Sequence, residues 1–144
     1  MEQRVTKPSA DDLAEIEADR DWVRGHYDSD AQHKYETLQG KLVLLQAILD
    51  AGWIERSETA KLQSLGVTLG DALAQELHLE WVSVDDEYGR NPALRVPGTS
   101  VIVFPRTMIS KRIERGETVN VSELFRGVCD HVRQMKRNPD YQRH

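Results

Sequence analysis

The sequence has a single cysteine, Cys129, and no long hydrophobic run among its 144 residues. One cysteine excludes an intramolecular disulfide and a zinc site built from several thiolates. The longest apolar runs, residues 42–45 and 101–104, are far shorter than the roughly 20 residues of a membrane span, so we expect no membrane association. The segment after Met1 lacks the apolar core of a secretory signal. We therefore expect a reduced, cytoplasmic location.

Basic residues are scarce in the first part of the chain and enriched in the last. The first 60 residues contain 13 Asp and Glu against 7 Lys and Arg, whereas residues 105–144 contain 5 against 9. These two regions either neutralise each other in the fold or present different faces to different partners. The formal net charge of −5 makes nucleic-acid binding an unlikely function, because duplex-binding domains usually carry a basic balance.

Hydrophobic periodicity predicts an α+β fold. Ser9 is a predicted N-cap of a helix that ends near Gly25, and a second helix starts after Ser29 and ends at Gly52. A short helix is expected to end at Gly66, with another beginning at Thr68. Near the C-terminus, Asn120 followed by Glu123 predicts the cap of an amphipathic helix. Residues 1–27 are expected to form an N-terminal helical extension, residues 28–137 a single α+β domain, and residues 138–144 a flexible tail.

Between these helices, residues 80–104 predict a three-stranded antiparallel meander. The expected strands are residues 80–86, 93–96 and 100–104, which are rich in valine and aromatic side chains. Pro97 and Gly98 fit the two central positions of a type II turn. This small sheet is expected to pack against the N-terminal and C-terminal helices.

Several short motifs resemble the bacterial family catalogued as domain of unknown function 3806. They are LGDAL at 69–73, EWV at 80–82, DEYGRNPALRVPGTS at 86–100, FP at 104–105, MISKR at 108–112 and RGE at 115–117. The resemblance spans roughly residues 68–130, is weaker over residues 41–63 and does not extend to residues 1–27. It implies a bacterial, soluble protein. It transfers no activity, catalytic residue or cofactor, because the family has none assigned.

Carboxylates and histidines are the candidate groups for metal chemistry. Asp85, Asp86 and Glu87 form the densest acidic cluster, and carboxylate oxygens suit Ca²⁺ or Mg²⁺. Neighbouring strand residues point to opposite faces, so pairing of this cluster with Arg90 or Arg95 is the simpler interpretation. The histidines lack the spacing of zinc hydrolases, and no nucleophile elbow or phosphate-binding loop is present. We therefore expect no cofactor and no conventional catalytic residues.

Two segments are candidate interaction surfaces. The turn at residues 88–92 presents Tyr88 and Arg90, residue types that are enriched at interface hot spots. A following helix contributes cationic side chains that could meet an acidic protein surface; these are Arg106, Lys111, Arg112 and Arg115. The simpler alternatives are local packing of Tyr88 and favourable interaction of the cations with a helix C-terminus.

The sequence thus favours a non-enzymatic protein-binding module. One alternative is an immunity-type protein that neutralises a basic toxin with its acidic first half. Another is a metal-dependent hydrolase that uses Asp85, Asp86 and Glu87. The apolar sheet face or the helix containing Leu42 could also support a homodimer.

Overall fold

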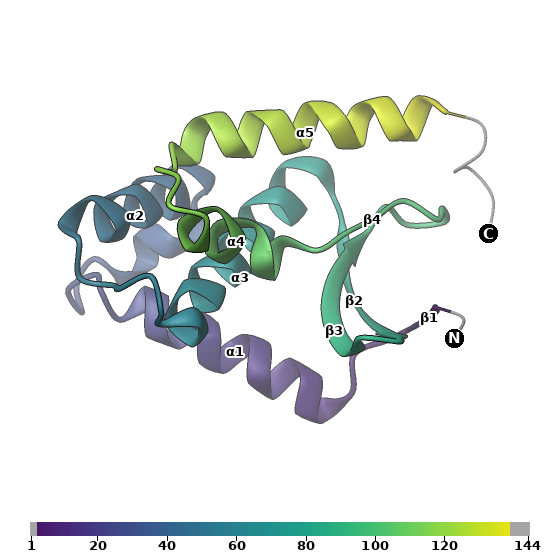
Figure 1. Cartoon of the computed structure of the whole chain (residues 1–144), viewed down its shortest axis with the longest axis horizontal. Helices are drawn as coiled ribbons and strands as arrows, with labels where there is room; N and C mark the ends of the chain where they lie inside the picture. Colours follow the sequence, from purple (N-terminus) through teal and green to yellow (C-terminus); the bar gives the residue numbers. More distant parts are fainter. Residues whose placement is uncertain (1–2, 139–144) are drawn as a thin grey trace.

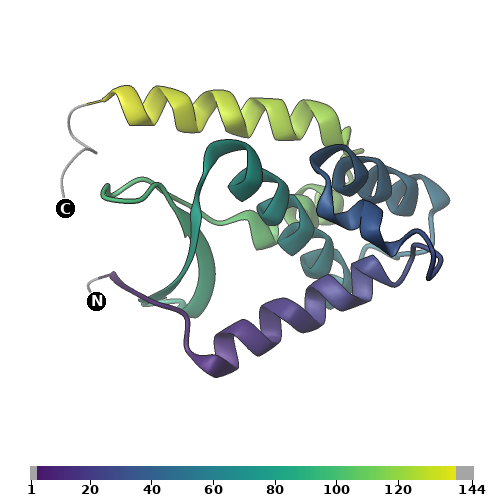
Figure 2. The ribbon, with the colours of Figure 1, turned by 180° about the vertical axis from the view of Figure 1, so that it is seen from behind.

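The structure is a computed structural model, and it describes residues 3–138. Within that range the chain forms five α-helices, two short 3-10 segments and a four-stranded antiparallel sheet of order β1-β2-β3-β4, which confirms the α+β class. The elements are β1 Arg4–Thr6, α1 Ala10–Arg24, η1 Gln32–Glu36, α2 Leu38–Ala51, α3 Thr59–Leu77, β2 Glu80–Asp86, β3 Gly89–Arg95, β4 Ile102–Val103, η2 Pro105–Thr107, α4 Met108–Glu114 and α5 Val121–Arg137. Figures 1 and 2 show α3 lying between α1 and α5.

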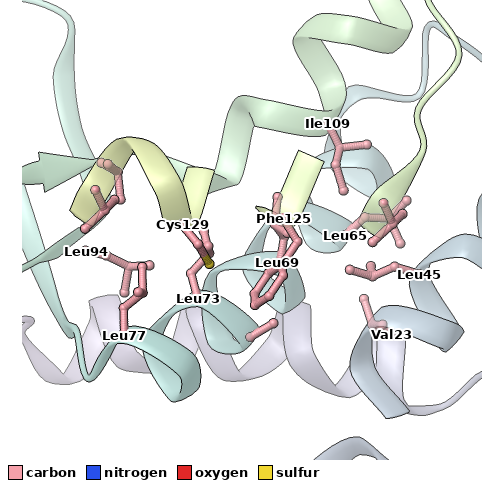
Figure 3. Close-up of a cluster of buried hydrophobic side chains, with 14 of the residues drawn as sticks. Val23, Leu45, Leu65, Leu69, Leu73, Leu77, Leu94, Ile109, Phe125 and Cys129 are labelled. Carbon is pink, nitrogen blue, oxygen red and sulfur yellow. The ribbon is translucent and has the colours of Figure 1, made fainter. Parts of the chain in front are cut away.

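Helix α3 is the centre of the hydrophobic core. Four of its leucines, at residues 65, 69, 73 and 77, recur every fourth residue, and Phe125 and Cys129 of α5 pack over them (Figure 3). The side chains of α3 are buried nearly all round, as expected for a helix covered on several sides by other elements. Val23 of α1 and Leu45 of α2 complete the cluster from the other side. The helices therefore form one continuous core.

The sheet has one strand more than the predicted three. The additional strand, β1, pairs antiparallel with β2, placing Val5 opposite Val84. Three residues are too few to show a periodic pattern, so this strand has no sequence signature. The strand expected at residues 100–104 is shorter, because only Ile102–Val103 pair with β3. The turn before it is as predicted, with Gly98 at a φ of 77°.

The break expected at Gly66 is wrong, because α3 continues through it without interruption. A Cβ at Gly66 would collide with the backbone carbonyl of Arg106, and one at Gly70 would lie 2.6 Å from the Trp81 ring. Both glycines thus allow neighbouring segments to approach α3 closely, and neither ends the helix. The second helix also begins later than expected, at Leu38 after the cap Thr37.

The described part of residues 1–27 is integrated into the fold. Ser9 and Asp12 form the complete capping box of α1, and Val23 is fully buried. Arg20 of α1 is joined to Asp71 of α3 by two hydrogen bonds of 2.7 and 2.8 Å. The expected extension therefore packs onto the domain. Residues 139–144 of the expected flexible tail lie outside the described residues.

The apolar faces considered for a homodimer are largely buried within the chain. The buried face of α2 packs on α3, although Val43 on the opposite side is 51% exposed. On the sheet, Val82, Val84 and Ala93 are buried beneath partly buried neighbours that include Phe104. Intrachain packing thus accounts for these apolar stripes.

Candidate functional site

A groove at the β2–β3 turn brings together three of the predicted interaction residues. Tyr88, Arg106 and Lys111 line a cavity of about 270 Å³, with Pro92 and Phe104 as its apolar wall. They come from the turn, η2 and α4, so the groove requires the sheet to pack against the segment that follows it. We call these five residues the Tyr88 groove.

Tyr88 is held on a braced turn, yet its side chain is left open. Its backbone N–H donates to Asp86 Oδ1 at 2.8 Å, and Gly89 follows with a φ of 108°. The tyrosine is 83% exposed. The alternative that Tyr88 packs locally is therefore wrong. An ordered backbone with an exposed aromatic ring suits recognition, because little order must be imposed on binding.

The two cations of the Tyr88 groove differ in their surroundings. Arg106 is partly buried. Its Nε is shielded from solvent, has no hydrogen-bond partner in the part of the chain that the structure describes, and lies 3.8 Å from Asp19 Oδ2. Lys111 is exposed on α4 and makes no ion pair with any residue in the described range 3–138. Lys111 is thus the cation most available to an incoming carboxylate.

The remaining predicted cations lie away from this groove. The Arg90 guanidinium binds Asp12 and Asp85, each at 2.6 Å, and so ties the β2–β3 turn to α1. Arg112 donates to the Met108 carbonyl at 2.9 Å and lines a separate cavity between α4 and α5. Arg115 pairs with Glu117. Sequence proximity grouped these side chains, whereas the fold separates them.

The acidic cluster at residues 85–87 is divided by the sheet. Asp85 lies opposite Arg90 in the β-ladder and Asp86 opposite Gly89, so their side chains fall on opposite faces. Arg90 binds Asp85, while Asp86 accepts the Tyr88 N–H. Across residues 3–138, no group of three or more His, Cys, Asp or Glu side chains is arranged to hold a metal ion.

A second site, which the sequence analysis missed, is centred on Asp71. Its carboxylate accepts four hydrogen bonds: two from Arg20, one from the Tyr35 hydroxyl at 2.9 Å and one from Trp81 Nε1 at 3.0 Å. Because the Tyr35 proton goes to Asp71, the Thr68 hydroxyl donates to the Tyr35 oxygen at 2.9 Å. The Asp71 network joins α1, η1, α3 and β2.

Burial and the network perturb the titration of two of its members. Burial, reinforced by the nearby Asp71 charge, raises the pKa of Tyr35 well above its usual range. The hydrogen bonds to Asp71 raise the pKa of Arg20. Both groups therefore keep their protons throughout the physiological pH range. This arrangement is suited to positioning side chains, and Tyr35 cannot act as a general base here.

Beside this network lies a polar pocket of about 360 Å³ between α1, η1, α2 and α3. Lys41 forms part of its wall and is only 6% exposed, and its ammonium donates to Gln75 Oε1 at 2.7 Å. The Lys41 ammonium and the Arg24 guanidinium lie 5.3 and 5.0 Å from the centre of the Tyr35 ring. Burial lowers the pKa of Lys41. The Asp71 and Glu36 charges oppose this effect, and the more weakly acting Arg20 and Arg24 charges add to it. We call this cavity the Lys41 pocket.

Cys129 has the surroundings of a packing residue. It is 2% exposed on the inner face of α5, and burial raises the pKa of its thiol. A raised pKa lowers the fraction of reactive thiolate.

No helix within residues 3–138 is long and apolar enough to cross a lipid bilayer.

Comparison with solved structures shows where this fold occurs. The chain is similar to a crystal structure of a protein from Bacteroides thetaiotaomicron VPI-5482, with a TM-score of 0.74 and 18% identity. The similarity covers 91% of this chain and 48% of that one, so this chain spans about half the length of the solved protein. At this identity the likeness establishes the fold alone.

Comparison with sequence families gives the relationship directly. No curated protein matches this chain. The family model described as domain of unknown function (DUF3806) matches residues 41–125, which include both α3 and the whole β2–β3 hairpin. Because this match covers more than half of the sequence, the chain belongs to the domain of unknown function 3806 family.

Proposed function

We propose that this protein is a non-enzymatic binding module that recognises an acidic segment of a partner protein at the Tyr88 groove. The observation that carries the proposal is the exposed ring of Tyr88, fixed on a braced turn beside Lys111 and Arg106. Tyrosine and arginine are enriched at the energetic centres of protein interfaces.

The size of the Tyr88 groove favours a protein partner over a free metabolite. Its volume of about 270 Å³ lies below the roughly 300–1,000 Å³ of typical small-molecule pockets. Such a volume accommodates one or two side chains of a docked segment. The Phe104 and Pro92 wall would contact an apolar side chain, and the Tyr88 ring would cover it from the exposed side.

The net positive charge of the side chains that line the groove favours an acidic partner. Two cations, Lys111 and Arg106, face one carboxylate, Asp86, whose Oδ1 accepts the Tyr88 N–H. An aspartate or glutamate beside the apolar side chain would pair with Lys111, which has no carboxylate partner within the described chain. The expected ligand is therefore a short segment in which acidic and apolar residues adjoin.

The two alternative functions have less support. A toxin-neutralising acidic face needs free carboxylates, and four of the six on α1 lie within 4 Å of an arginine of this chain, namely Asp12, Glu17, Asp19 and Asp21. A metal-dependent hydrolase needs converging carboxylates, and the sheet directs Asp85 and Asp86 to opposite faces.

Selection from a display library of short random peptides tests the proposal. We expect selected peptides to combine acidic and apolar residues and to bind the parent protein saturably. Both Tyr88→Ala and Lys111→Glu should weaken binding at least about tenfold, the loss of about 1.4 kcal/mol expected at an interface hot spot.

Matched controls separate the groove from general surface effects. Trp53→Ala removes another aromatic side chain, which is 66% exposed, and Arg115→Glu reverses another surface charge beyond α4. Both control variants should bind like the parent. The proposal is wrong if no peptide is enriched, or if the groove variants bind the selected peptides as tightly as the controls do.

A further inference from the structure

The Lys41 pocket contains a buried lysine that forms no direct ion pair with any of the described residues. Lysine is almost never fully buried unless it is paired. Yet Lys41 is only 6% exposed, and its ammonium donates to a neutral amide oxygen of Gln75. Within residues 3–138, no carboxylate lies within ion-pair distance of the Lys41 ammonium. A lysine ammonium has three N–H donors, so this arrangement leaves donor capacity facing the cavity.

Three carboxylates line the pocket, those of Glu17, Glu36 and Asp71, and two of them are engaged elsewhere. Asp71 accepts four hydrogen bonds, two on each oxygen, from Arg20, Tyr35 and Trp81. Glu17 pairs with Arg20 at 3.1 Å and with Arg24 at 3.4 Å. Neither of these two carboxylates is therefore available to pair with Lys41. The Glu36 charge attracts the Lys41 ammonium but forms no ion pair with it within the described residues.

The positions of the surrounding groups are fixed by hydrogen bonds. The Gln75 amide donates to the Glu36 carbonyl at 3.3 Å, which directs its oxygen toward Lys41. Tyr35 is held by Asp71 and Thr68, and both Lys41 and Arg24 approach its ring. Both cations line the same pocket and the Arg24 charge acts unfavourably on the Lys41 ammonium, so an anion bound by both would reduce their mutual repulsion.

We propose that the Lys41 pocket binds a small molecule through an anionic group, a carboxylate or a phosphate, that pairs with the Lys41 ammonium beside Arg24. The volume of about 360 Å³ is within the range of small-molecule sites. Such a ligand would supply an anionic acceptor in addition to the neutral Gln75 oxygen, and Arg24 would add a second cationic contact. This site lies between the helices and is separate from the Tyr88 groove, so the proposal is independent of the protein-binding function.

Titration with inorganic phosphate and with succinate, each against chloride at equal ionic strength, tests this proposal. The readout is the side-chain NMR signal of Lys41 in lysine-labelled protein. We expect saturable binding of at least one anion, and the two arms show whether the site prefers phosphate or carboxylate. Binding should also raise the pKa of Lys41, because a bound negative charge stabilises the ammonium.

A matched pair of variants assigns the effect to the pocket. Lys41→Met should weaken anion binding at least tenfold, as measured by isothermal titration calorimetry. Lys34→Met removes the same charge from an exposed residue outside the pocket and should bind like the parent. Lys111→Glu, which alters the Tyr88 groove, should also leave anion binding unchanged.

Two results would overturn the proposal. One is the absence of saturable binding by the parent for both anions, with an unchanged Lys41 pKa. The other is binding by Lys41→Met within twofold of the parent. The thermal midpoint without anion reports whether Lys41→Met is folded, and we expect it to match or exceed that of the parent, because the substitution removes a buried charge. If that variant fails to fold, the pKa measurement on the parent decides the outcome.

Discussion

Replacing Asp71 with asparagine would test the network that joins α1 to the rest of the domain. The side chains of Asp71 and Arg20 are 11% and 23% exposed, so the pair is largely shielded from solvent. Removing one partner of a buried ion pair costs about 3–5 kcal/mol. Asparagine offers one acceptor oxygen where the carboxylate has two, and its NH₂ group would face one of the present donors. Since Arg20 keeps some solvent contact, we expect a loss near the lower limit, about 3 kcal/mol.

This loss is large enough to measure by urea denaturation and by thermal unfolding. For a chain of this size, about 3 kcal/mol corresponds to a fall in the thermal midpoint of roughly 10 °C. Asp130→Asn is the control, because Asp130 is 75% exposed and lies 3.8 Å from Arg133, and it should change stability by less than about 0.5 kcal/mol. In an Arg20→Met background, the cost of Asp71→Asn should fall by more than about 1 kcal/mol. A loss below about 1 kcal/mol for Asp71→Asn alone would refute the reasoning.

Local sequence signals predicted three helix ends and one turn correctly. Ser9, Asn120 and Gly52 occupy the capping positions expected of them, because a cap depends on residues within one turn of itself. The Pro97–Gly98 turn is correct for the same reason: each residue fixes its own backbone conformation.

Predictions failed where distant segments decide the outcome. Gly66 has the local character of a helix end, but the backbone of Arg106 packs against that position and requires the absence of a side chain. The strand β1 depends on pairing with β2, nearly eighty residues away, which no local pattern encodes. Tertiary contact overrides propensity in both cases.

The candidate sites show the same division. Tyr88 and Lys111 were recognisable as exposed binding residues, but the sequence did not show that they share a groove while Arg112 and Arg115 do not. The Asp71 network was missed because Arg20 is 51 residues away. Thr68 and Asp71 were the available signal, because they are the polar residues of an otherwise apolar stretch of α3, residues 65–74, but they were interpreted as the start of a helix.

Three further predictions test packing, pH dependence and thiol chemistry. Gly70→Ala should destabilise the protein by about 1–3 kcal/mol, because the added methyl group would overlap the indole ring of Trp81. Gly127→Ala has open space around it and should stabilise the protein by up to about 1 kcal/mol, because alanine favours the helix. Urea denaturation measures both changes. The hydrogen bond from Arg90 holds the pKa of Asp12 far below its ordinary value of 3.8. The ionised Asp12 therefore contributes its full stabilisation above about pH 4, and this stabilisation is lost as the pH falls from 3.8 toward the lowered pKa. Arg90→Met should therefore make stability less dependent on pH below about 4, measured by denaturation at several pH values, and an unchanged dependence would show that Arg90 does not set the titration of Asp12. Native Cys129 should react with a thiol reagent at least about a hundredfold more slowly than the urea-unfolded chain, because burial both blocks access and raises the thiol pKa; equal rates would place this side chain outside the core.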